Sequence, residues 1–328
     1  MMFEQKLSGS YYNMGLETGR MFKKLGLPKF PPKLDEAQLE FGRKCTEVVE
    51  AHAPGLLEEL QGMADGSGFD FDVFAASELC LSIKSACSVI AISGEHMVDG
   101  VPVLLRNHDW NEGGDKDLTV CWTSPEGGLK SLGTTFLRLR LARFGGVNEA
   151  GLAISSALAD WTNPQPGVMF HIATRWILDT CQSTKEAVAY LEKIPKTWGM
   201  MYVIADKAND IAIVEAHAER MNVIWPDNGF AAVSNNFHSP EMKVLDKRGI
   251  SWENPRIRVE YYNDWFVGKS GSISLEEVQA VMRNHEHFAC DHVEGGFTIW
   301  SWIAPIGERK LLVCQGSPCK GEYVPYTF

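Results

Sequence analysis

The hydrophobic pattern of the chain changes at Cys87, and this change constrains the fold more than any other feature. Over residues 35–68 apolar side chains such as Leu56, Leu60 and Met63 recur at the spacing of amphipathic helices. After Cys87 the sequence consists mainly of short apolar runs separated by turn residues, which is typical of strands. We therefore expect helices before Cys87 and a strand-rich region after it.

The order of the predicted elements indicates a layered α+β fold. Pro54 and Gly55 divide the first helical run in two, and a further helix is expected over 72–83. Asp99-Gly100 and Asn209-Asp210 mark hairpin turns. Two groups of strands are expected on either side of a helical pair at 169–181 and 184–194: 87–92, 101–107, 118–124, 134–144 and 151–158, then 201–206, 211–217, 221–226 and 230–236. Helices at 253–266 and 274–284 and strands at 298–306 and 310–316 follow. Two stacked antiparallel sheets with helices outside, in one folding unit, account for this order.

Composition excludes several classes of partner. The formal net charge is −11 and no basic stretch offsets it, which argues against nucleic acid and anionic membranes. The longest apolar runs are too short to span a bilayer. The first twelve residues contain no apolar signal core, so we expect a cytoplasmic protein.

The eight cysteines do not form a recognisable metal or disulfide framework. The chain is large and contains no Cys-x-x-Cys pair, so reduced thiols and no bound metal or cofactor are expected. The cluster His285-Glu286-His287 with Cys290 and His292 does contain ligand types, and a metal-dependent hydrolase built on its histidines is one alternative.

Cys87 stands at the start of a strand whose hairpin partner ends in charged residues. The segment 101–109 returns from the Asp99-Gly100 turn, so Arg106 and Asp109 are expected beside Cys87. A guanidinium near a thiol favours the reactive thiolate. The alternatives are a buried structural cysteine and a solvated Arg–Asp pair at a strand end.

Several motifs in order along the chain resemble one enzyme family. "CSVIAI…DGVPVLLRNHDW" looks like the mature start of cysteine amino-terminal nucleophile (Ntn) hydrolases. "GGVNEAGLAISS", "YVIADKANDIAIVEAHAERMNVI", "AAVSNNF" and "VCQGSPCKGEYVPY" resemble the acyl-coenzyme A:6-aminopenicillanate acyltransferase family, which is related to choloylglycine hydrolases and penicillin V acylases. "GSYYNMGLETGR" resembles the opening of that family's propeptide. The resemblance implies the Ntn αββα sandwich, with a helical propeptide-like segment 1–86 and a catalytic region 87–328.

The resemblance also implies roles for individual residues. The chain would be cut between Ala86 and Cys87, and the new α-amine, whose usual pKa is near 8, would act as general base for the Cys87 thiol. Arg106 would hold the thiolate and Asp109 would orient the amine. Asn235 would supply the oxyanion hole, and Arg256 would support the site, with Arg258 as the alternative register.

The implied activity is the making or breaking of a linear non-peptide amide bond through an acyl-cysteine intermediate. The expected partners are a small-molecule amide or acyl donor, with transfer from a coenzyme A thioester as an alternative, and a homo-oligomer is compatible with the sequence. Two departures bear on this activity. Ala86 replaces the usual glycine before the nucleophile, and Ala157-Leu158 stands where related enzymes have a second asparagine. An unprocessed Ntn-fold protein that only binds or acts as a scaffold is the alternative from another class.

Overall fold

The structure, a computed structural model, describes residues 2–26, 31–80, 86–248, 253–292 and 296–328. Its strands form two sheets. The first sheet runs in the order β1 (Phe3–Gly9), β4 (Leu118–Pro125), β5 (Ser131–Phe136), β6 (Gly145–Asn148), β7 (Leu152–Asp160), β8 (Gly199–Asp206), β9 (Ile211–Ala216) and β10 (Met221–Ile224). The second runs β11 (Phe230–Val233), β2 (Ala86–Ile92), β3 (Val103–Trp110), β12 (Phe297–Pro305), β13 (Lys310–Gln315) and β14 (Val324–Thr327). Every described pairing between these strands is antiparallel except that of β1 with β4.

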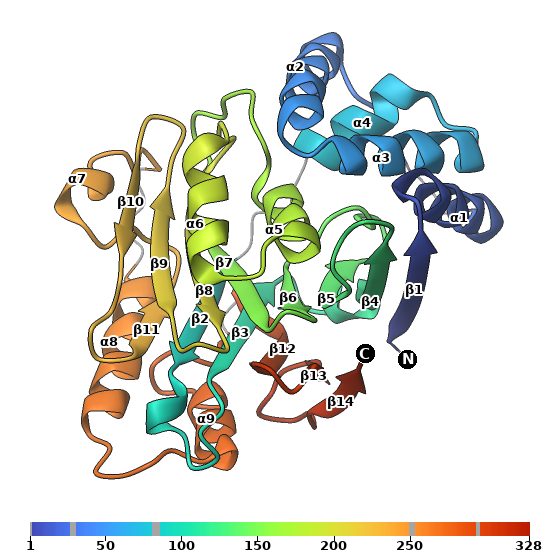
Figure 1. Ribbon diagram of the computed structural model, residues 1–328. Helices are drawn as coiled ribbons and strands as arrows, with labels where there is room; N and C mark the ends of the chain where they lie inside the picture. Colours follow the sequence, from blue (N-terminus) through green and yellow to red (C-terminus); the bar gives the residue numbers. More distant parts are fainter. Residues whose placement is uncertain (1, 27–30, 81–85, 249–252, 293–295) are drawn as a thin grey trace.

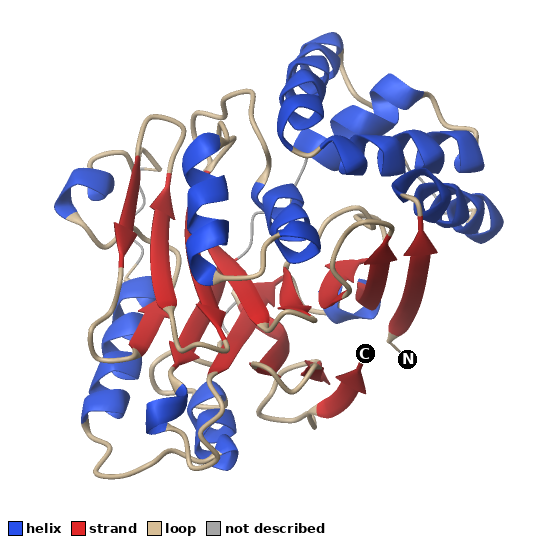
Figure 2. Cartoon of the chain, in the orientation of Figure 1, coloured by secondary structure: helices blue, strands red, loops and turns tan. Residues whose placement is uncertain are grey.

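The two sheets stack face to face between helical layers (Figures 1 and 2). Strand β2 of the second sheet packs on β7 and β8 of the first. The helices α5 (Phe170–Thr180) and α6 (Thr184–Lys193) cover the outer face of the first sheet, whereas α8 (Asn254–Val267) and α9 (Leu275–Met282) lie on the second. A short helix, α7 (Pro240–Lys243), follows β11. The expected αββα sandwich is confirmed.

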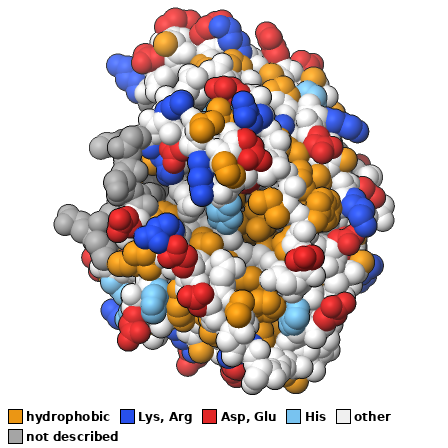
Figure 3. Space-filling model, turned by 90° about the vertical axis from the view of Figure 1, so that its left-hand side faces the viewer, with side chains coloured by type: hydrophobic (Ala, Val, Ile, Leu, Met, Phe, Trp, Pro, Cys, Tyr) orange, Lys and Arg blue, Asp and Glu red, His pale blue; other side chains and the backbone are white. Residues whose placement is uncertain are grey.

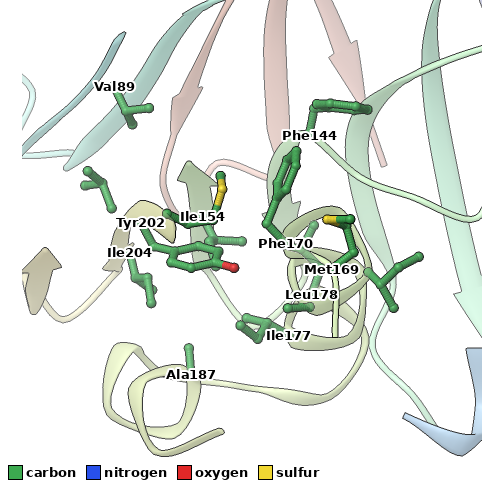
Figure 4. Close-up of a cluster of buried hydrophobic side chains, with 14 of the residues drawn as sticks. Val89, Phe144, Ile154, Met169, Phe170, Ile177, Leu178, Ala187, Tyr202 and Ile204 are labelled. Atoms are coloured by element: carbon green, nitrogen blue, oxygen red, sulfur yellow. The ribbon is translucent and has the colours of Figure 1, made fainter. Parts of the chain in front are cut away.

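Hydrophobic side chains fill the space between the sheets and beneath the helices. Figure 4 shows one part of this core, to which Val89 of β2, Ile154 of β7 and Tyr202 of β8 contribute. Side chains alternate across a strand, so β2 contributes to two cores. Val89 belongs to the core between the sheets, whereas Ile90 belongs to the core under α8 and α9. Cys87, two residues before Val89, faces the space between the sheets.

The described residues before Cys87 form four helices: α1 (Tyr11–Leu25), α2 (Glu36–His52), α3 (Pro54–Ser67) and α4 (Phe71–Cys80). Helices α1 and α3 approach closely because glycines line their crossing. A Cβ on Gly15 would lie 1.8 Å from the Glu59 carbonyl oxygen, and one on Gly62 would lie 2.1 Å from that of Tyr12. The segment is not wholly helical, because β1 pairs with β4 of the first sheet. The division at residue 86 stays a prediction.

One strand prediction is wrong in part. The run 134–144 was expected to be a single strand, but β5 ends at Phe136 and the chain then turns. Arg140 and Arg143 are buried there and donate to backbone carbonyls of the same loop, including Leu137 and Ala142. The strands β1, β6 and β14 and the helices α1 and α7 were not predicted. The last three residues of the helix expected over 72–83 lie outside the described residues.

On the side of the molecule that Figure 3 shows, the described basic side chains do not form a continuous patch. Acidic and basic side chains are interspersed there, and hydrophobic side chains gather across the middle of the face. Among the described helices, none is long and apolar enough to cross a membrane.

Candidate active site

The pairing of β2 with β3 brings together residues that are about twenty positions apart. Cys87 lies directly opposite His108, and Ala86 lies opposite Asp109. Directly opposed side chains share a face of the sheet. Cys87, Arg106 and His108 therefore lie between the two sheets, and Asp109 lies on the face covered by α8 and α9.

The Arg106 guanidinium is fixed against the Cys87 sulfur. Its Nη2 lies 2.8 Å from Cys87 Sγ. Its Nη1 donates to the Phe144 carbonyl and, at 3.2 Å, to Ser155 Oγ, and its Cζ lies 5.4 Å from the Trp300 ring centroid. Arg106 is only 1 % exposed. A buried, immobilised cation at this distance favours the thiolate over the thiol.

His108 is a third member of this cluster that the sequence did not assign. Its Nδ1 lies 3.6 Å from Cys87 Sγ and 2.8 Å from Arg106 Nη2, and its ring stacks on Trp300 at 4.3 Å. Burial and, to a smaller extent, the Arg106 charge hold the pKa of His108 well below its ordinary value. The imidazole is therefore neutral, and because Arg106 donates to Nδ1, its proton resides on Nε2. In this state Nδ1 is an acceptor and does not add positive charge at the thiol.

Asn235 holds the backbone of Cys87 from the opposite side. The Cys87 N–H donates to Asn235 Oδ1 at 2.7 Å, and Asn235 Nδ2 donates to the Leu158 carbonyl at 2.8 Å. The preceding Ser234 Oγ donates to the Cys87 carbonyl at 2.8 Å. This loop follows β11, which is the other neighbour of β2 in the sheet. Cys87 is thus bound through its sulfur, its N–H and its carbonyl.

Two charged residues that the sequence did not assign stabilise the Asn235 loop. Arg248 Nη2 donates to the Asn235 carbonyl at 2.8 Å. The Glu215 carboxylate accepts from the Ser239 N–H at 3.1 Å and from Asn222 Nδ2 at 2.9 Å. Neither contact has a local sequence signal, because both depend on how β9, β10 and the loop after β11 come together.

Asp109 forms a second buried cluster on the helix-covered face. Its carboxylate accepts from Arg258 Nη1 and from Thr298 Oγ1, each at 2.6 Å. Burial raises the pKa of Asp109, while the Arg258 charge and the Thr298 hydrogen bond offset part of this effect. Asp109 is paired across the sheet with Ala86, the residue before the bond whose cleavage would create the new amino terminus.

The structure does not bring Arg256 to the site. Its side chain is exposed and pairs with Glu260 at 2.6 Å, one helical turn away. Arg258 is only 2 % exposed and contacts Asp109. Side chains two positions apart on an α-helix point in directions that differ by about 200°. Only one of the two arginines can therefore face the sheet. The register that includes Arg258 is the one that the structure supports.

An apolar cavity of about 360 Å³ lies between the first helices and the strand-rich region. Its walls come from α2 and α4 on one side and from Trp161, Pro164 and Trp198 on the other. The Arg248 guanidinium lies 5.5 Å from the Trp161 ring centroid and also binds the Asn235 carbonyl. One residue therefore links a wall of the cavity to the Asn235 loop.

The comparison with family models decides the affiliation of the chain. Residues 97–318 match the family described as "Acyl-coenzyme A:6-aminopenicillanic acid acyl-transferase". The chain belongs to this family. The matched range contains Arg106, Asp109, Asn235 and Arg258, and it begins ten residues after Cys87. No curated protein matches the sequence.

Solved structures of Ntn hydrolases share the fold of this family member at low sequence identity. A variant of the conjugated bile acid hydrolase from Clostridium perfringens superposes with a TM-score of 0.50 at 13% identity, covering 74% of this chain and 97% of that one. Penicillin V acylase from Agrobacterium tumefaciens gives a TM-score of 0.50 at 16% identity, with coverage of 70% and 83%. The Caenorhabditis elegans ortholog of N-acylethanolamine-hydrolyzing acid amidase gives a TM-score of 0.50 at 14% identity, with coverage of 67% and 93%. The Ntn-hydrolase fold of the chain is thereby shown.

Proposed function

We propose that the protein is a cysteine Ntn hydrolase or acyltransferase that becomes active when the chain is cut between Ala86 and Cys87. The observation that carries the proposal is the environment of Cys87. Its sulfur lies 2.8 Å from a buried guanidinium, and its N–H lies 2.7 Å from the Asn235 amide oxygen. A structural cysteine in an apolar core needs neither contact, whereas a nucleophile that is also the first residue of a chain uses both.

The cleavage step uses only groups of this chain and water. Cys87 Sγ attacks the Ala86 carbonyl carbon, a C–S bond forms, the C–N bond breaks, and the thiol proton goes to the departing nitrogen. Water then hydrolyses the thioester, which leaves a carboxylate on Ala86 and a free amine and thiol on Cys87. Arg106 stabilises the sulfur anion during attack, and Asn235 Oδ1 holds the Cys87 nitrogen in place.

The same residues serve substrate turnover. The Cys87 amine accepts the thiol proton, the thiolate attacks the amide carbonyl of the substrate, and the amine product leaves with that proton. Water hydrolyses the acyl-cysteine, or a second amine takes the acyl group. An amide nitrogen carries two N–H bonds, so the Asn235 side chain can bind both the Leu158 carbonyl and the oxyanion of the substrate. Asp109, held by Arg258, would orient the new amine.

The apolar cavity suggests which end of the substrate the protein recognises. We propose that the acyl group of a linear amide binds against Trp161 and Trp198, with the scissile carbonyl toward Cys87. A volume of about 360 Å³ suits a small molecule rather than a polypeptide. The acyl-cysteine intermediate is the same for an amide or for a coenzyme A thioester as donor. A screen that offers both kinds of donor to the processed protein distinguishes hydrolysis from transfer.

Intact-protein mass spectrometry of freshly purified wild type, Cys87→Ala and Cys181→Ala tests the proposal. We expect two fragments that part between Ala86 and Cys87 in the wild type and in Cys181→Ala, in which a buried cysteine outside the site is changed. Cys87→Ala should remain one folded, uncut and inactive chain. An active Cys87→Ala protein would refute the mechanism.

One observation favours a second candidate, an unprocessed protein that only binds its ligand. Ala86 lies in the regular strand β2, paired with Asp109. Self-cleavage requires a sharp bend of the backbone at this residue, and alanine permits fewer backbone conformations than glycine. An uncut wild type without amidase activity under all conditions of the screen would support this candidate.

A further inference from the structure

Four possible metal ligands come together at one end of the second sheet. His285, Cys290 and His292 lie in the loop between α9 and β12, and Cys319 lies in the turn between β13 and β14. Their ligating atoms all lie within 4.8 Å of one another. No sequence motif unites them, since Cys319 is 27 residues beyond His292.

Two of the distances between the ligand atoms match those of a tetrahedral site. His292 Nε2 lies 3.5 Å from Cys290 Sγ and 3.2 Å from Cys319 Sγ. Around a tetrahedral zinc ion, with bonds of about 2.3 Å to sulfur and about 2.0–2.1 Å to nitrogen, such sulfur–nitrogen pairs are about 3.5 Å apart. The two histidine rings are nearly perpendicular, with centroids 4.9 Å apart, so two different directions of approach are available.

Other contacts hold both segments in place. In the first, the Cys290 N–H donates to the Asn284 carbonyl at 2.8 Å. Arg283 Nε donates to the Pro318 carbonyl at 2.9 Å and so joins the loop to the turn that carries Cys319. Ser317 Oγ in that turn donates to the Thr298 carbonyl at 2.7 Å. The four side chains are therefore gathered by the backbone around them, which lowers the entropic cost of forming a metal site.

We propose that His285, Cys290, His292 and Cys319 bind one zinc ion in a structural site. Two thiolates and two imidazoles are a standard ligand set for zinc. Binding displaces one proton from each thiol, so two protons are released for each metal ion bound. Four protein ligands fill the tetrahedron and leave no position for a water molecule or substrate. The site is therefore structural, unlike the metal-dependent hydrolase that the histidine cluster alone suggested.

The position of the site indicates what it stabilises. Asp291 lies between two of the ligands, and its carboxylate lies 3.6 Å from Arg258 Nη2. The Asp291 N–H donates at 2.8 Å to Thr298 Oγ1, which itself donates to Asp109. A metal ion that fixes residues 285–292 would thus fix the loop beneath the Arg258–Asp109 pair.

Elemental analysis of protein purified without added metal or chelator tests the proposal. We expect about one zinc per chain in the wild type and in Cys181→Ser, and at least a tenfold lower content in Cys319→Ser. Because Cys319→Ser can fail to fold, the wild type is also stripped with a chelator and titrated with cobalt(II). Saturation at one equivalent, with a thiolate-to-cobalt charge-transfer band, supports the site.

Three results would overturn the proposal: wild type that is native but neither contains nor takes up zinc or cobalt, unchanged zinc content in folded Cys319→Ser, and a Cys290–Cys319 disulfide in the purified protein. Metal content is measured without an activity assay and does not depend on chain cleavage. Zinc is therefore expected in Cys87→Ala as well, so a failure of this proposal is distinguishable from a failure of the proposed function.

Discussion

Replacing each of two neighbouring arginines on α8 by methionine should give very different losses of stability. Arg258 Nη1 lies 2.6 Å from a buried Asp109 oxygen, so Arg258→Met leaves a buried carboxylate without its main counter-charge. Removing one partner of such a pair costs about 3–5 kcal/mol. Arg256 pairs with Glu260 on the exposed side of the helix, where water screens the interaction, so Arg256→Met should change the stability little. We therefore expect a difference of about 3 kcal/mol or more between the variants.

Urea unfolding followed by tryptophan fluorescence measures this difference. The loss in Arg258→Met should depend on pH, because burial raises the pKa of Asp109 and the variant lacks the guanidinium that offsets this rise. The folded variant then retains a proton that the unfolded chain releases near pH 4, and its stability falls as pH rises from there to the raised pKa of Asp109.

A double variant, Arg258→Met with Asp109→Asn, supplies the control, because it removes the carboxylate as well as its counter-charge. It should recover part of the loss. Equal losses in Arg256→Met and Arg258→Met, or no recovery in the double variant, would refute this account of the pair.

Four other outcomes are expected. Burial raises the pKa of Glu78 to about 8, so the folded protein holds a proton there between about pH 4.5 and 8 and loses stability as pH rises through that window. Glu78→Gln should stabilise the protein by about 3 kcal/mol at pH 7 and hardly at all at pH 4, as measured by urea unfolding. Gly15→Ala should destabilise the α1–α3 contact by about 1–3 kcal/mol, whereas Gly271→Ala, at an open position with an ordinary φ, should cost less in the same assay. Trp161→Ala should raise the KM of a hydrophobic amide about tenfold with a smaller change in kcat. After cleavage, the fragments 1–86 and 87–328 should elute together in gel filtration and separate only in denaturant.

The sequence predicted the hairpin that builds the site, because hairpin geometry depends on local signals. Asp99-Gly100 lies in the loop that joins β2 to β3, and the antiparallel pairing of these two strands brings Arg106 beside Cys87. The same pairing also brings His108 to the sulfur. That contact requires the register to one residue, which the turn signal alone does not supply.

The parts that were missed depend on contacts between distant segments. Arg256 and Arg258 occupy similar sequence environments, and only the orientation of α8 on the second sheet distinguishes them. Cys319 joins the histidine cluster through the packing of β13 and β14 and has no spacing signal. The run 134–144 has strand composition throughout, but Arg140 and Arg143 satisfy loop carbonyls and allow the chain to turn inside the protein.

The contacts between the segment before Cys87 and the rest of the chain determine whether that segment stays bound after cleavage. Strand β1 is hydrogen-bonded along β4, and Glu59 of α3 forms a buried ion pair with Arg175 of α5, at 2.9 Å. Arg175 also binds Asp179, whose carboxylate accepts from Tyr11 of α1. Separating the segments would expose their shared apolar core to water, which is unfavourable in proportion to the apolar area exposed. Cutting one peptide bond leaves all of these contacts in place. Cleavage should therefore free the Cys87 amine while residues 1–86 remain in place and continue to form one wall of the cavity.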